Sequence, residues 1–152
     1  MLRRTPCIGT CSTTYGDLIC RGCKRFAHEI VQWNGYEPEQ RRAVWQRLLG
    51  LRAGAVRSVL EVRDPDRLRA QAQRVGLSID GELELENLLY ELLQRLQWRE
   101  PNAPIDSLGV ALAPGAETRL EPVPESLIAL IDREFYLRSV AQYERNYRIP
   151  TG

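Results

Sequence analysis

The sequence lacks long hydrophobic runs, and it contains almost no histidine or lysine. Its longest apolar stretches, such as residues 108–113, fall far short of the ~20 residues that a membrane-spanning helix needs. The charged start, Met-Leu-Arg-Arg-Thr-Pro-Cys, is followed by no apolar stretch, so no export signal is predicted. His28 and Lys24 are the single residues of their types, which leaves little basis for a histidine triad or for lysine catalysis. We therefore expect a cytoplasmic protein without a membrane segment, an enzymatic activity or a small-molecule substrate.

Cysteine is absent from residues 24–152, because Cys7, Cys11, Cys20 and Cys23 all lie before them. A disulfide framework would spread its bridges along the chain and would need an oxidising compartment, so it is the least favoured interpretation. The spacing C-x3-C-x8-C-x2-C instead gives two close pairs that can face one another across a tetrahedral ion. It matches neither ferredoxin spacing, although four cysteines can also hold a cluster. The pattern predicts one metal site on all four cysteines, with zinc as the first candidate and an iron–sulfur cluster as the alternative.

A site with four cysteine ligands is closed, since it keeps no open position for water or substrate. The predicted metal is therefore structural, and hydrolytic chemistry is not expected. His28 follows the last cysteine closely, but with four thiols present it is expected on the polar face of a helix.

The net charge of +1 hides an uneven distribution. Residues 1–75 hold 14 basic against 7 acidic side chains, whereas residues 76–152 hold 7 against 13. Such halves favour either an anionic partner for the front half or attraction between the two halves. On the first alternative the protein would bind RNA or DNA as well as protein, and the candidate contacts are Arg21, Lys24, Arg25, Arg41, Arg42 and Arg47.

Hydrophobic periodicity predicts a mainly α protein. After a loop-like segment up to residue 23, helical spacing begins at Cys23 and ends at Asn34-Gly35. Further helices are expected from Pro38 to Leu51, unless Gly50 ends the helix first, and then over residues 65–75 and 82–98. Residues 52–63 fit neither the helical nor the strand period.

Five prolines between residues 101 and 124 predict a linker or an extended arm. We expect four segments: a metal-binding module over residues 1–50, a helical domain over 51–100, the Pro-rich linker over 101–124 and a C-terminal helix within 125–152. That helix should begin near Pro124. It carries a stripe that either docks on its own domain or serves as a partner helix, formed by Tyr136, Val140, Tyr143 and Tyr147.

The cysteine segment also resembles a known family. The runs Cys7-Ile-Gly-Thr-Cys11 and Asp17-Leu-Ile-Cys20-Arg-Gly-Cys23-Lys-Arg25, followed by Glu29-Ile30, Trp33 and Glu39-Gln-Arg-Arg42, are similar to the small bacterial family catalogued as domain of unknown function 1289. The resemblance covers about residues 5 to 50. It implies a metal on the four cysteines, which is often labelled iron–sulfur, and no established activity. Lys24, Phe26 and His28 depart from the family pattern, which has glycine in place of Lys24.

Two hypotheses about function follow. The first is a non-enzymatic adaptor or regulator, in which a structural metal site holds a basic helical module that binds protein or RNA. The second is an iron–sulfur protein with a redox or iron-sensing role.

Overall fold

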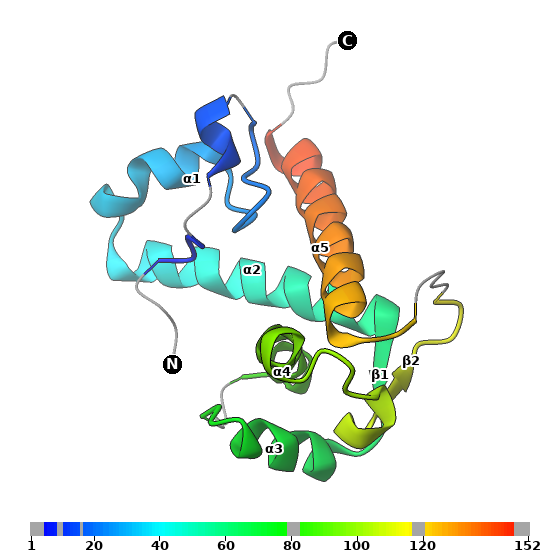
Figure 1. Cartoon of the computed structure of the whole chain (residues 1–152). Helices are drawn as coiled ribbons and strands as arrows, with labels where there is room; N and C mark the ends of the chain where they lie inside the picture. The colour runs from blue at the N-terminus through cyan, green and yellow to red at the C-terminus, as the bar shows by residue number, and fades with distance from the viewer. Residues whose placement is uncertain (1–4, 9–10, 16, 79–82, 117–120, 148–152) are drawn as a thin grey trace. The chain divides into compact units, whose positions relative to one another are not determined.

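The protein is mainly α-helical, as its periodicity predicts, with helices over 66% of the structure. The computed structural model describes residues 5–8, 11–15, 17–78, 83–116 and 121–147 (Figure 1). The α-helices of this part are α1 (Ala27–Gln32), α2 (Pro38–Val59), α3 (Pro65–Arg74), α4 (Leu85–Arg99) and α5 (Pro124–Tyr147). The short elements are the 3-10 helices η1 (Ser12–Tyr15), η2 (Trp33–Gly35) and η3 (Ile105–Leu108) and the strands β1 (Leu60–Val62) and β2 (Val110–Leu112). None of these helices is long and apolar enough to cross a membrane.

The chain divides into two compact units. Unit 1 holds residues 52–134, and unit 2 combines residues of the range 2–51 with 135–152. The division falls within α2 and within α5, so each of these helices contributes one part to each unit.

Unit 1 is built around the apolar face of α4. Leucines on this helix are fully buried, as are apolar residues of α3 and of the first half of α5: Leu68, Leu89, Leu92, Leu93, Leu96, Leu127 and Ile131. β1 and β2 form an antiparallel ribbon, in which Glu61 lies opposite Ala111. The core of unit 1 therefore forms from helices that all lie within residues 52–134.

Unit 2 buries the aromatic residues that follow the cysteines. Phe26, Trp33 and Phe135 are each at most 6% exposed, and Val44 and Leu48 on α2 are buried as well. Phe26 contributes to this core from just after the last cysteine, and Phe135 contributes from α5. The segment around the second cysteine pair and the second half of α5 thus share one core.

The expectation of a linker over residues 101–124 is wrong. This segment contains η3 and β2, and Leu108 is only 1% exposed. Gly109 adopts a φ of 74°, which favours glycine, and its carbonyl accepts hydrogen bonds from the N–H groups of Arg63 and Asp64. The prolines therefore bound short ordered elements that pack on β1 and α3.

Two helix boundaries also differ from those predicted. The helix expected from Cys23 begins at Ala27, because Lys24 adopts a φ of 66° that a helix excludes. α2 does not end at Gly50, since a buried face continues through Ala53 and Val56 and outweighs the roughly 1 kcal/mol that glycine costs within a helix.

Other predicted helices are confirmed. α3 begins at Pro65 after Asp64, whose side chain accepts the N–H of Arg67, and Gly76 with a φ of 82° follows its C-terminal end. α4 begins at Leu85, later than predicted: residue 82 lies outside the described residues, and residues 83 and 84 are not helical. α5 begins at Pro124 as predicted.

Candidate metal centre

Cys20 and Cys23 lie in the turn of a short hairpin, residues 18–27. The N–H of Cys20 donates to the carbonyl of Arg25 at 2.9 Å, and the N–H of Lys24 donates to the carbonyl of Cys20 at 2.8 Å. Ile19 and Phe26 form an antiparallel bridge beyond the turn. The backbone thus turns tightly around the second cysteine pair.

Lys24 is the described non-glycine residue with a positive φ in this turn. Left-handed backbone costs an ordinary residue about 1–2 kcal/mol, so the surrounding contacts must hold it there. Its ammonium group donates to the carbonyl of Gly22 at 3.0 Å and lies 5.3 Å from the ring centre of Phe135. These contacts therefore hold the lysine in the left-handed conformation of the turn.

The two thiols of the hairpin are buried but differ in acidity. Burial raises the pKa of Cys20, but hydrogen bonds from the backbone of Cys23, Ser12 and Gly22 and from the Cys23 side chain outweigh it and lower this pKa to about 7. Burial raises the pKa of Cys23, against a hydrogen bond of 3.3 Å from the Arg25 guanidinium to its sulfur. Backbone donors aimed at sulfur suit a thiolate ligand.

Two contacts tie the segment of the first cysteine pair to this hairpin. The backbone of Ser12, which directly follows Cys11, hydrogen-bonds the Cys20 sulfur, and the N–H of Arg21 donates to the Ser12 hydroxyl at 2.8 Å. The Cys11 sulfur lies 2.8 Å from the hydroxyl of Thr13, and Cys7 is half-buried.

Thiol groups are ligands that a soft metal ion prefers. Within the described ranges, no three His, Cys, Asp or Glu side chains form a group that could hold a metal ion, so the structure does not bring the four cysteines together. If a thiolate-bound ion is present, Cys7, Cys11, Cys20 and Cys23 are the residues that would hold it.

His28 and the tyrosines of α5 belong to an aromatic cluster in unit 2. The ring of Phe26 meets Tyr143 and Tyr147 edge-on, with centres 5.2 Å and 5.3 Å apart, and His28 lies 5.0 Å from Tyr147. The second half of α5 therefore docks on the hairpin of its own chain, which is one of the two outcomes that the stripe allowed.

The basic residues proposed as contacts to an anion occupy different surroundings. Lys24 and Arg25 are each only 4% exposed, and Arg25 stacks on Trp33 at 4.9 Å. Arg41 donates to the carbonyls of Trp33 and Asn34. The structure leaves two of the six on the surface, Arg21 and Arg42.

Arg47 and Glu29 form a buried ion pair that the sequence did not reveal. The guanidinium holds both carboxylate oxygens and lies 4.1 Å from the ring centre of Phe26. Glu29 also accepts the N–H of Phe26 at 2.8 Å, as the third residue of α1 does in a capping box. A glutamate as the third residue of a helix was the signal for this role, but it requires the correct start at Ala27.

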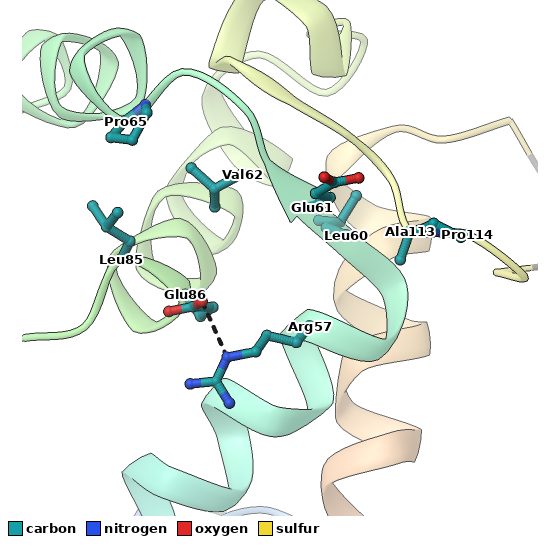
Figure 2. Close-up of a pocket in the computed structure, with 9 residues that line it drawn as sticks. All are labelled: Arg57, Leu60, Glu61, Val62, Pro65, Leu85, Glu86, Ala113 and Pro114. Carbon is teal, nitrogen blue, oxygen red and sulfur yellow. Dashed lines mark hydrogen bonds and ion pairs between the residues drawn. The ribbon is translucent and has the colours of Figure 1, made fainter.

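In unit 1 some arginines pair with carboxylates of the acidic half of the chain, whereas others, such as Arg67 with Asp64, pair within the basic half. Arg52 lies 3.1 Å from Glu91 and Arg74 lies 2.7 Å from Glu100. Figure 2 shows Arg57 directed at Glu86, on one side of a hollow of about 370 Å³ beside β1. These pairs favour the second alternative for the charge asymmetry, attraction between the halves.

Comparison with known families gives one match. Residues 5–52 match the family model described as Protein of unknown function (DUF1289). The match covers the hairpin, α1 and most of α2, and it confirms the resemblance found from the cysteine spacing. No curated protein and no solved structure is significantly similar to the chain.

Proposed function

We propose that this protein is a non-enzymatic adaptor or regulator, in which Cys7, Cys11, Cys20 and Cys23 hold a structural metal ion, with zinc in first place. The observation that carries the proposal is the hairpin of residues 18–27, in which backbone groups hydrogen-bond the sulfurs of the buried Cys20 and Cys23. A bound ion would supply ordering free energy to a segment with few large apolar side chains.

The same hairpin supports a role in binding a partner. Phe26 is the residue on which α1, Arg47 and the tyrosines of α5 converge. Order at the cysteines therefore extends to the surface that the second half of α5 forms. We favour a protein partner over RNA, because Lys24, Arg25 and Arg47 are occupied by rings, carbonyls and a carboxylate within the chain.

Metal analysis of protein purified under anaerobic conditions tests the proposal. We expect one zinc per chain in the wild type and much less in Cys20→Ser and Cys23→Ser, with Ser58→Ala in unit 1 as the control that keeps its metal. Stoichiometric iron with acid-labile sulfide would favour the iron–sulfur alternative instead. A folded protein with four titratable thiols and neither metal would refute the proposal.

Two further measurements test the ordering role of the metal site and the class of partner separately. In Cys20→Ser, amide exchange should accelerate over residues 5–33 and stay unchanged in α4, because the ordering is local to unit 2. Titration with labelled single-stranded RNA at two salt concentrations tests the nucleic-acid alternative. Affinity weaker than about 100 μM at low salt, below typical non-specific binding, would leave the protein partner.

A further inference from the structure

A groove of about 480 Å³ lies in unit 2 between the first strand of the hairpin and the second half of α5. Asp17, Leu18 and Ile19 form one wall. The other wall comes from one side of α5: Tyr136, Val140, Tyr143, Glu144 and Tyr147. Leu18 and Tyr147 are 59% and 48% exposed, so the groove offers apolar and aromatic surface to a partner.

Two of the three tyrosines in this wall are held by Phe26. Phe26 is 1% exposed and meets Tyr143 and Tyr147 edge-on at interplanar angles of 68° and 72°. Edge-to-face contacts fix ring orientation, and the guanidinium of Arg47 packs over the ring of the same phenylalanine. The tyrosine rings are therefore preorganised before any partner arrives, which lowers the entropy cost of binding.

The charged side chains that line the groove are carboxylates, and an arginine lies at its rim. Its lining includes the carboxylates of Asp17 and Glu144, and none of the described residues that line it is a lysine, arginine or histidine. Tyrosine faces carry negative electrostatic potential and attract cations. Tyrosines together with carboxylates thus form a surface that favours a cation and disfavours phosphate.

An arginine of the chain itself already uses the rim of this surface. The guanidinium of Arg21 lies 5.4 Å from the ring centre of Tyr136, and its Nε lies 3.5 Å from a carboxylate oxygen of Asp17. Both side chains are well exposed, at 71% for Arg21 and 38% for Asp17, so the pair is weak and exchangeable. Arg21 shows that a guanidinium can stack on a tyrosine of this wall beside a carboxylate.

We propose that this groove, between Asp17–Ile19 and the second half of α5, binds a segment of a partner protein that carries arginine between apolar residues. The arginine would lie on the tyrosine faces near Asp17 and Glu144, and the apolar side chains would cover Leu18 and Val140. The inference deepens the proposed adaptor function by naming the chemistry of the partner, and it rests on that function for the claim that a protein partner exists.

Fluorescence anisotropy with a labelled peptide, Gly-Leu-Arg-Leu-Arg-Gly, tests the proposal on the full-length protein as purified. The control peptide carries citrulline for arginine, which keeps the shape and removes the charge. We expect the arginine peptide to bind at least tenfold more tightly and to weaken as salt is raised. Asp17→Asn combined with Glu144→Gln should weaken binding about tenfold, whereas Asp66→Asn, an exposed carboxylate in unit 1, should have no effect.

Variants at Tyr136 test the aromatic part. Tyr136→Leu should weaken binding about fivefold, and Tyr136→Phe, which keeps the ring, should bind like the wild type. Equal binding of the citrulline peptide, no effect of the carboxylate variants, or no binding up to about 1 mM would overturn the proposal. Self-association that the carboxylate variants abolish, without peptide binding, would place a second copy in the groove and would equally overturn it.

Metal content is measured on the same samples. Peptide binding by protein that holds no stoichiometric metal would refute the metal site and support the groove. Stoichiometric metal without peptide binding would refute the groove alone.

Discussion

Replacing Glu29 by glutamine should destabilise unit 2 by about 3 kcal/mol. The carboxylate of Glu29 is 5% exposed and the guanidinium of Arg47 is 17% exposed, so both charges are largely removed from water. Breaking a buried pair by neutralising one partner costs about 3–5 kcal/mol, because the other charge stays buried and unpaired. The partial exposure of Arg47 places the expected value at the lower end. The Nε of Arg47 is buried and has no hydrogen-bond partner among the described residues, so the guanidinium is incompletely paired even in the wild type.

Local hydrogen exchange measures this effect without assuming that both units unfold together. A loss of about 3 kcal/mol should accelerate exchange of protected amides around α1 about 100-fold, and amides of α4 in unit 1 should keep their rates. Asp66→Asn is the matched control, because its pair with Arg69 is 97% and 44% exposed and should contribute at most about 0.5 kcal/mol.

The double variant Glu29→Gln with Arg47→Met completes a double-mutant cycle, which measures the coupling between the two side chains. Since methionine removes the unpaired charge and preserves much of the packing on Phe26, the double variant should be more stable than Glu29→Gln alone. A cost below about 1 kcal/mol for Glu29→Gln, or strict additivity of the two changes, would refute the view that the pair is buried and coupled.

Three further outcomes follow from the geometry. Lys24→Gly should be about 1 kcal/mol more stable than Lys24→Ala in urea unfolding, because only glycine adopts a φ of 66° without strain. Gly109→Ala should lower the melting temperature of unit 1 by far more than Gly115→Ala: both have positive φ, but a Cβ at Gly109 would lie 2.6 Å from a carbonyl oxygen and one at Gly115 would meet nothing within 4 Å. Burial, and then the charge and hydrogen bond of Asp132, raise the pKa of Tyr90, so its folded form stays protonated above pH 10 while the unfolded form ionises. Stability should therefore fall above pH 10, and comparison of melting temperatures should show a smaller fall in Tyr90→Phe.

Local signals predicted the elements that depend on few residues. Asp64-Pro65 predicted the start of α3, because a capping side chain and a proline act within one turn. Pro124 did the same for α5. The ribbon of β1 and β2 was missed, since Glu61 and Ala111 pair across 50 residues and nothing near either residue indicates the other. The prolines around β2 then favoured a linker.

In the candidate site, too, features set by neighbouring residues were predicted and contacts between distant residues were missed. The spacing of Cys20 and Cys23 predicted a close pair, and both residues lie in one tight turn of the hairpin. The contacts of Ser12 with Cys20 and Arg21 depend on how a loop folds back, which spacing does not encode. Counting charges could not reveal that Arg25 is buried, because cation–π contacts with Trp33 make burial of a guanidinium acceptable.

The hairpin links the two proposals physically. Ile19 lines the groove and Phe26 sets its tyrosine rings, and these two residues are bridged directly beyond the cysteine turn. Anything that orders Cys20 and Cys23 therefore also restricts the positions of the groove walls. The first ligand that binds already orders the hairpin, so the second ligand binds without that free-energy cost. A metal on the cysteines should therefore favour a peptide in the groove, and a peptide should favour the metal to the same extent.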